Sequence, residues 1–261
     1  MQSQQSVSLS GLSAIRIGGR AELVYYPETM AEFTELLAGQ PELPVVGGGT
    51  NVFFGDLPEL ICTQKLNKIT ETAAGIEAEC GARLAELFDF AAGVPATVGG
   101  GVRMNFGAFG YALKDFIISA QVWDSKDQQI KTLTREALRL GYRTSGFYGT
   151  VLSALFSGKQ LERKAEFFKA RQAKMPWGRP NIGSVFKNPP AGQSAGQLIE
   201  AAGLKGYVYK DLQISNEHAN IIVNNGKASA AELQGLIKFI QTAVREKTGV
   251  ALTPEIQCPG K

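Results

Sequence analysis

The chain has 261 residues, 44% of them hydrophobic and 20% charged, and its formal net charge is +3. This composition is typical of a globular enzyme with one or two domains. The basic residues do not cluster as a nucleic-acid footprint requires, and no apolar run approaches the roughly 20 residues that cross a bilayer. Neither nucleic-acid binding nor membrane insertion is therefore expected.

The three cysteines, Cys62, Cys80 and Cys258, lie far apart in the chain, and the only histidine is His218. This pattern matches neither a metal site nor the disulfide framework of a secreted protein. No metal is expected, and the cytoplasm is the expected location. The first ten residues lack the basic start and apolar core of a signal peptide, which agrees with that location.

Up to residue 150 the predicted strands and helices follow one another in mixed order. A strand at residues 21–26 is followed by Thr29 and Glu32, whose spacing is that of a capping box, so a helix is expected from Thr29 to about residue 38. A second helix is expected over residues 83–92. Period-two patterns and turn residues predict further strands at residues 44–46, 60–65, 76–79, 117–124 and 129–133.

Beyond residue 150 the second part of the chain is predicted to be mostly helical. Its clearest helix begins at Ser229, which forms a second capping box with Glu232, and ends at Gly249. The apolar residues of this helix recur at helical spacing: Leu233, Leu236, Ile237, Ile240 and Val244. The other elements expected here are strands at residues 151–156 and 220–223 and helices at residues 162–174 and 194–202.

Two glycine-rich runs are the most informative feature of the first part. Residues 45–51 read Val-Val-Gly-Gly-Gly-Thr-Asn, and six of the eighteen residues from Gly93 to Gly110 are glycine. Because glycine has no Cβ, a bulky ligand can press directly against main-chain N–H groups. Two such backbone cradles predict a large anionic ligand held from two sides, and a dinucleotide fits that description.

Neither glycine run fits the more familiar explanations. A flexible linker would be rich in serine and would lack the interleaved Val, Met and Phe. The dinucleotide fingerprint of a doubly wound sheet requires a third glycine that is missing after Gly47 and Gly49, and the later run leads into aromatic residues rather than an amphipathic helix. The two cradles therefore predict a different fold.

Three short clusters carry polar groups suited to catalysis. They contain Arg143, Ser184 and Glu255. Taken singly, each residue is as typical of a surface charge or a turn. A serine nucleophile is not expected, because the Gly-x-Ser-x-Gly elbow of hydrolases is absent and Phe186 stands at its last position. A hydroxyl that donates a proton, in contrast, needs no histidine beside it.

Nine short motifs occur in one order across nearly the whole chain. They lie at residues 15–23 (Ile-Arg-Ile-Gly-Gly-Arg-Ala-Glu-Leu), 46–51, 93–100, 104–110 (Met-Asn-Phe-Gly-Ala-Phe-Gly), 142–145 (Tyr-Arg-Thr-Ser), 183–189 (Gly-Ser-Val-Phe-Lys-Asn-Pro), 195–206, 218–220 (His-Ala-Asn) and 254–255 (Pro-Glu). This ordered set resembles the UDP-N-acetylenolpyruvoylglucosamine reductase family.

Two details of the sequence depart from the commonest pattern of this family. Phe106 stands where the family commonly has Ala, and the short spacing from Arg143 to Lys174 resembles the family's short type, which lacks a tyrosine-loop insertion.

The resemblance implies an α+β fold. It implies an FAD-binding domain of the vanillyl-alcohol-oxidase type over residues 1–150, built from two α+β subdomains at about 1–68 and 69–150. A C-terminal α+β substrate domain would span residues 151–249, and residues 250–261 would return to the active site. The implied reaction is NADPH-dependent reduction of UDP-N-acetylglucosamine enolpyruvate to UDP-N-acetylmuramate through tightly bound FAD, for peptidoglycan synthesis, in a monomeric enzyme.

The resemblance also implies residue roles. Arg143 and Glu255 would stabilise an enolate-like charge, and Ser184 would protonate the neighbouring carbon. The implied cofactor-binding residues are Val46, Gly47, Gly48, Gly49, Thr50, Asn51, Gly93, Thr97, Gly99, Gly100, Asn105, Gly107 and Ala108. The implied substrate-binding residues are Tyr142, Lys174, Lys187, Asn188 and His218.

Two alternative functions are also compatible with the two glycine-rich runs. Another FAD-dependent oxidase or dehydrogenase of the same fold would not need Ser184 together with Lys187 and Asn188. A non-catalytic module that binds FAD or a nucleotide sugar would not need Arg143, Ser184 and Glu255.

Overall fold

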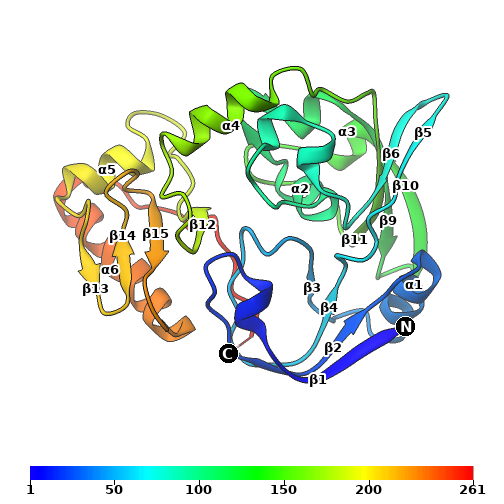
Figure 1. The fold of residues 1–261 in the computed structure, drawn as a ribbon, viewed down its shortest axis with the longest axis horizontal. Coiled ribbons are helices and arrows are strands. Elements are labelled where there is room, and N and C mark those ends of the chain that lie inside the picture. Colours follow the sequence, from blue (N-terminus) through cyan, green and yellow to red (C-terminus); the bar gives the residue numbers. More distant parts are fainter. Residues whose placement is uncertain (261) are drawn as a thin grey trace. The chain divides into compact units, whose positions relative to one another are not determined.

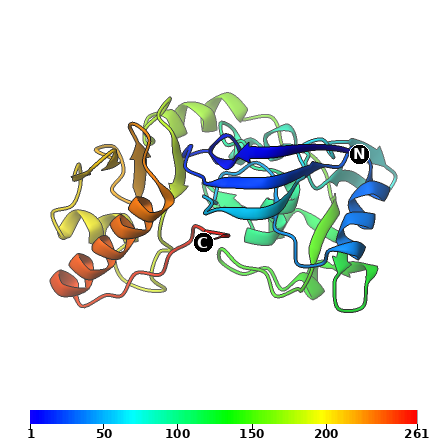
Figure 2. The ribbon, with the colours of Figure 1, turned by 90° about the horizontal axis from the view of Figure 1, so that it is seen from below.

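The structure is a computed structural model that describes residues 1–260 (Figures 1 and 2). The chain forms two compact units, and each is assembled from several separate stretches of sequence. Unit 1 comprises Met1–Ser6, Glu22–Gly48 and Pro58–Lys169, and unit 2 comprises Val7–Ala21, Gly49–Leu57 and Ala170–Lys261. This division follows contacts between residues, so the expected assignment of cofactor and substrate domains stays a prediction.

The first sheet has four strands and lies mostly in unit 1. Its order is β1-β2-β4-β3, from β1 (Gln2–Ser8), β2 (Arg20–Tyr26), β4 (Leu57–Cys62) and β3 (Val45–Val46). Helix α1 (Met30–Gly39) begins where the sequence predicts, because the Thr29 hydroxyl accepts the N–H of Glu32 at 3.2 Å. Its buried Phe33 and Leu37 pack with Ile61 of β4.

The second sheet of unit 1 is fully antiparallel and has five strands. Its order is β10-β9-β11-β6-β5, from β10 (Gln129–Thr134), β9 (Ile117–Asp124), β11 (Thr150–Phe156), β6 (Gly75–Glu79) and β5 (Ile69–Thr72). A row of buried alanines crosses it, since Ala154 pairs with Ala78 on one side and Ala120 on the other. Helix α2 (Val98–Met104) packs over β11, where these small side chains leave room.

The prediction of a helix over residues 83–92 is wrong. The structure has two short 3₁₀ turns there, η2 (Leu84–Glu86) and η3 (Asp89–Ala91). Phe88 between them is extended, with φ −137° and ψ 128°. The backbone of residues 87–89 pairs instead with Gln160, whose carbonyl accepts the N–H of Asp89 at 2.7 Å and whose N–H donates to Leu87 at 2.8 Å. This long-range pairing replaces the hydrogen bonds that a continuous helix would make.

Helix α2 was not expected, because it occupies the glycine-rich run. Three of its seven residues are glycine, which ordinarily disfavours a helix. A Cβ at Gly101 would lie 2.5 Å from Cδ1 of Leu84, so the glycine permits close packing. Four short elements complete unit 1: the hairpin β7 (Gly107–Ala108) and β8 (Tyr111–Ala112), the turn η4 (Leu113–Asp115) and helix α3 (Arg135–Leu138).

Unit 2 contains a second antiparallel sheet, of order β12-β15-β14-β13, with helices packed on it (Figure 1). Its strands are β12 (Asn181–Ser184), β13 (Val208–Tyr209), β14 (Leu212–Ile214) and β15 (Ile221–Asn224). The other elements are η1 (Leu9–Leu12), α5 (Ala195–Ala201) and α6 (Ala230–Thr248), while α4 (Lys164–Gln172) leads from unit 1 into unit 2. One hydrophobic core joins α5, α6, the sheet and Ile15, Ile17 and Phe53.

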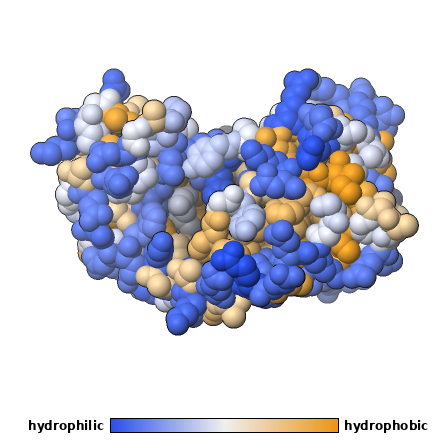
Figure 3. All heavy atoms as spheres, turned by 90° about the horizontal axis from the view of Figure 1, so that it is seen from above, coloured by the Kyte–Doolittle hydropathy of each residue, from blue (hydrophilic) through white to orange (hydrophobic). Residues whose placement is uncertain are grey.

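Most of the surface seen in Figure 3 is hydrophilic, and the apolar residues on that face gather over part of unit 1. Among the described residues, no helix is both long enough and apolar enough to span a membrane.

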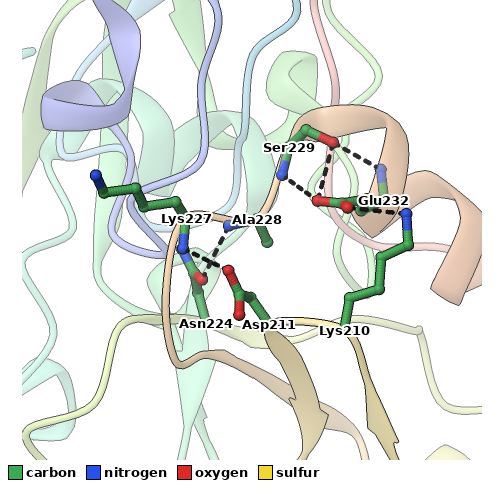
Figure 4. Close-up of polar contacts among 7 residues, drawn as sticks. All are labelled: Lys210, Asp211, Asn224, Lys227, Ala228, Ser229 and Glu232. Carbon is green, nitrogen blue, oxygen red and sulfur yellow. Dashed lines mark hydrogen bonds and ion pairs between the residues drawn. The ribbon is translucent and has the colours of Figure 1, made fainter.

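Helix α6 confirms the strongest helix prediction. Its five stripe residues are buried, and its capping box is complete. The Ser229 hydroxyl accepts the N–H of Glu232 at 3.2 Å, and the Glu232 carboxylate accepts the N–H of Ser229 at 2.8 Å (Figure 4). Lys210 donates to the same carboxylate at 2.9 Å. The Ser229 bonds and Lys210 together lower the pKa of Glu232 to about 2.

Replacing Ser229 with Ala should lower the free energy of unfolding by about 1 kcal/mol, the usual effect of a lost N-cap. A urea titration of both proteins measures this difference, and equal stability would contradict the capping role.

The Glu232 carboxylate has a lowered pKa, so its contribution to stability is complete above the pKa of an unfolded glutamate, about 4.3. That stabilisation is lost as the pH falls towards about 2. The difference in Tm between wild type and Glu232→Gln should therefore be present at neutral pH and close across this acid range. A difference that does not change with pH would contradict the assignment.

Candidate functional site

The two glycine runs lie against each other within unit 1. A Cβ on Gly48 would stand 1.9 Å from the carbonyl oxygen of Pro95, and a Cβ on Gly47 would stand 2.0 Å from Oγ1 of Thr97. A side chain at residue 48 would require the backbone at Pro95 to move, and one at residue 47 would require the Thr97 side chain to move. The two glycine-rich runs are thus brought together, residues 47–48 against residues 95–97.

Thr97 and Gly100 present hydrogen-bonding groups at this contact. Thr97 is only 2% exposed, and within residues 1–260 its hydroxyl has no hydrogen-bond partner. The N–H of Val98 and that of Gly99 donate to protein carbonyls, but no described residue accepts the N–H of Gly100. Gly100 is exposed, and a Cβ there would meet only the Thr97 hydroxyl, at 3.9 Å. A buried hydroxyl without a partner beside an open glycine is suited to a polar ligand.

Four predicted site residues, Asn105, Gly107, Tyr142 and Arg143, lie near the C-terminal end of α2. The side-chain amide of Asn105 donates to the carbonyl of Gly141 at 2.8 Å, and Nη2 of Arg143 donates to the carbonyl of Gly107 at 2.9 Å. The guanidinium also lies 5.6 Å from the ring centroid of Tyr142. Arg143 therefore lies beside the Gly107–Ala108 strand of the hairpin.

The remainder of the first glycine run belongs to unit 2. Gly49 has φ +63°, and a Cβ on it would lie 1.9 Å from the carbonyl oxygen of Leu12. Two hydrogen bonds hold Asn51 on the C-terminal segment: its side chain donates to the carbonyl of Glu255 at 3.1 Å, and its carbonyl accepts the N–H of Gln257 at 3.0 Å. Thr50 lies between these two anchored positions.

Ser184 and Glu255 lie on adjacent backbone segments of unit 2. Ser184 ends strand β12, and the N–H of Glu255 donates to the carbonyl of Val185 at 2.8 Å. The N–H of Lys187 likewise donates to Thr253 at 2.9 Å. Ser184, Lys187 and Glu255 are all partly exposed. Arg143 belongs to unit 1, so the expected joint action of Arg143, Ser184 and Glu255 stays a prediction.

Residues 175–259 match the model of the UDP-N-acetylenolpyruvoylglucosamine reductase C-terminal domain. The chain is 36% identical to the UDP-N-acetylenolpyruvoylglucosamine reductase of Caldicellulosiruptor bescii, over 97% of this chain and 89% of the relative. It is 37% identical to that of Limosilactobacillus reuteri, over 99% and 95%. The chain belongs to the UDP-N-acetylenolpyruvoylglucosamine reductase family.

A solved structure agrees with this assignment to the reductase family. The UDP-N-acetylenolpyruvylglucosamine reductase of Thermus caldophilus is 30% identical, with a TM-score of 0.79 over 99% of both chains. The predicted α+β fold class and the family resemblance are therefore confirmed. Phe106, which stands where the reductase family commonly has Ala, packs at 6.0 Å between ring centroids on Phe90 in the core of unit 1.

His218 and Asn188, two expected substrate residues of the reductase family, lie near the start of α5. Asn188 accepts the N–H of Ala195 at 3.0 Å through its side chain, and a Cβ on Gly196 would lie 3.3 Å from Cε1 of His218. Nδ1 of His218 accepts the N–H of Asn220 at 3.2 Å, so the proton of the neutral ring resides on Nε2. Burial lowers the pKa of His218. Lys174 is exposed just beyond α4.

Sequence reasoning missed Asn220 as a supporting residue, although it stands in the His-Ala-Asn motif. Asn220 is 3% exposed, and its side-chain amide both accepts the N–H of Phe186 at 3.0 Å and donates to the carbonyl of Phe186 at 2.8 Å. It thereby fixes the backbone two residues after Ser184. Residues 1–260 hold no group of three or more His, Cys, Asp or Glu side chains that could bind a metal ion.

Gly48→Ala and Gly100→Ala form a matched pair that tests the contact between the glycine runs. The Gly48 methyl would collide with the Pro95 carbonyl, so this variant should lose several kcal/mol of stability or fail to fold, because backbone must move. The Gly100 methyl meets open space within a helix, so its stability should be unchanged or rise by up to about 1 kcal/mol. Thermal unfolding monitored by circular dichroism compares the two, and equal stability would refute the contact.

Proposed function

We propose that this chain catalyses the NADPH-dependent reduction of the enolpyruvyl ether of UDP-N-acetylglucosamine to the lactyl ether of UDP-N-acetylmuramate, with FAD as its cofactor. Family membership over nearly the whole chain supports an FAD-dependent oxidoreductase of peptidoglycan precursor synthesis. One structural observation favours a catalytic over a merely binding role. Ser184 and Glu255 are 71 positions apart, yet a 2.8 Å hydrogen bond joins the backbone beside Ser184 to Glu255.

The residues of unit 1 fit a bound FAD. Within residues 1–260 the Thr97 hydroxyl and the Gly100 N–H have no protein acceptor, and the glycines beside them leave main chain accessible to a diphosphate. In unit 1 we assign FAD binding to these two residues together with Val46, Gly47, Gly48, Gly93, Gly99, Gly107 and Ala108. The family resemblance further assigns Gly49, Thr50 and Asn51 of unit 2 to FAD binding. Bound FAD supplies hydride transfer from NADPH to the substrate.

The chain's own residues manage the charge and the proton in this reaction. Hydride addition to the terminal vinyl carbon places negative charge on the neighbouring carbon and its carboxylate. Arg143 stabilises that charge electrostatically, and Glu255 does so in a protonated or proton-sharing form. The Ser184 hydroxyl then donates its proton to the neighbouring carbon, which completes addition of H⁻ and H⁺ across the double bond.

The nucleotide part of the substrate is assigned to Tyr142, Lys174, Lys187, Asn188 and His218. His218 is suited to this role because its neutral ring keeps the proton on Nε2, from which it donates to a diphosphate oxygen. Lys174 and Lys187 supply positive charge for the same anion. We further propose that the enzyme is a cytoplasmic monomer, and its three free cysteines agree with a reducing compartment.

The purified protein tests the proposed function directly. It should be yellow, its flavin absorbance should bleach under anaerobic NADPH, and the absorbance should recover when the enolpyruvyl nucleotide sugar is added. UDP-N-acetylglucosamine itself is the matched control, because it has no vinyl group to accept a hydride. Bleaching without recovery on the enolpyruvyl compound would refute the substrate assignment, and colourless protein that takes up no FAD would refute the cofactor.

Ser184→Ala should leave flavin reduction by NADPH nearly intact and slow flavin reoxidation by the substrate about 10²–10⁴-fold, because only the second step needs a proton donor. Stopped-flow absorbance separates the two steps. Ser184→Cys keeps an acidic proton at the position and should retain more of the second step than Ser184→Ala. Equal slowing of both steps would assign Ser184 a structural role.

A further inference from the structure

The side chain of Asn105 faces protein at both of its polar ends. Asn105 is 4% exposed; its Nδ2 donates to the carbonyl of Gly141 at 2.8 Å, and its Oδ1 accepts the N–H of Lys114 at 3.0 Å. Its backbone ends α2 in the left-handed region, with φ +42°. A side chain held in this way by two backbone groups is suited to fixing their positions.

The partner of Asn105 is the turn that carries Arg143. The N–H of Gly141 donates to the carbonyl of Thr144 at 3.1 Å, which closes a four-residue turn. Arg143 has φ +52° within it, a conformation that costs a non-glycine residue of the order of 1 kcal/mol or more. Such a turn persists only where its surroundings hold it.

Three hydrogen bonds hold this turn against residues 103–107. The Ser145 hydroxyl donates to the carbonyl of Arg103 at 2.9 Å, Asn105 donates to Gly141, and Arg143 donates to the carbonyl of Gly107 at 2.9 Å. Asn105 provides the central bond of the three, and it is the only one of these donors whose residue is fully buried. Asn105 thus holds the turn at Gly141, two residues before Arg143.

We infer that Asn105 is a positioning residue that aims Arg143, and that its side chain does not contact the cofactor. This inference rests on the proposed function, from which Arg143 takes its catalytic role. The sequence analysis expects Asn105 to bind the cofactor, and we propose instead that Asn105 orients Arg143. Without the Nδ2 donor, the Gly141 carbonyl loses its partner, the strained turn relaxes, and Arg143 no longer holds its direction.

Asn105→Asp removes the amide donor to Gly141 and keeps the Oδ1 acceptor for Lys114. Aspartate also adds a buried charge, so Asn105→Gly, which removes the donor without adding a charge, is measured beside it and should give the same result. In the presence of Arg143, flavin reoxidation by the enolpyruvyl substrate should slow about 10–100-fold, as small displacements of catalytic groups do. In an Arg143→Ala background, Asn105→Asp should slow flavin reoxidation less than about twofold, because the side chain through which Asn105 acts is already absent. Equal slowing in both backgrounds would overturn the inference.

If Asn105 contacted the cofactor instead, the same proteins would behave differently. Asn105→Asp would then weaken FAD affinity, measured by flavin fluorescence on titration of apoprotein, and would slow flavin reduction by NADPH in both backgrounds. We expect both quantities to be unchanged by Asn105→Asp. Ser153→Ala removes a side-chain hydrogen bond, to Glu77 at 3.0 Å, from a buried serine in another part of unit 1, so it serves as the control for a simple loss of stability.

Hydrogen exchange tests the positioning without any turnover. Peptides covering residues 139–147 should exchange faster in Asn105→Gly than in wild type, because glycine keeps the left-handed backbone and removes only the side chain. Unchanged exchange there would overturn the inference even if the enzyme is active. If the wild-type protein instead fails to reduce the enolpyruvyl substrate, the proposed function falls while this exchange result still stands.

Discussion

The close approach of two backbones in unit 1 is the constraint on which the candidate cofactor site depends. The Pro95 carbonyl occupies the space that a side chain on Gly48 would need, and the Thr97 side chain occupies the corresponding space at Gly47. This contact places a loop that follows β3 against the start of α2. Because glycine has no side chain, the loop comes close to the start of α2, where no described residue accepts the N–H of Gly100.

A second backbone contact organises unit 2. The C-terminal segment pairs with Asn51 through residues 255 and 257, and with Val185 through Glu255. Residues from three distant parts of the sequence thereby share one ladder of hydrogen bonds. Residues 255–257 form a C-terminal strap, a segment that is hydrogen-bonded both to the end of the first glycine run and to the end of β12. The candidate proton donor and the candidate acid both lie on this strap or directly beside it.

Three of the six non-glycine residues of unit 1 that have positive φ lie in the segments around Arg143. Asn105, Phe109 and Arg143 all have positive φ without being glycine. Such conformations persist where hydrogen bonds and packing compensate their energy, and they are common where a side chain must be aimed. Around Arg143 that compensation comes from backbone carbonyls at residues 103, 107 and 141, each with a side-chain donor.

Local signals in the sequence determined the elements whose stability is local. The caps at Thr29 and Ser229, the stripe of α6 and the alternating pattern of β9 are short-range features, and each predicted element formed. The ordered motifs also determined the family. Where distant partners set the conformation, only the tertiary structure decided. Gln160 converts residues 83–92 from a helix into two turns, and the packing of Leu84 allows a glycine-rich helix at residues 98–104. The facing of Gly48 and Pro95, the hold of Asn105 on Gly141 and the pairing of Glu255 with Val185 depend on contacts between residues far apart in the chain, which no local pattern encodes.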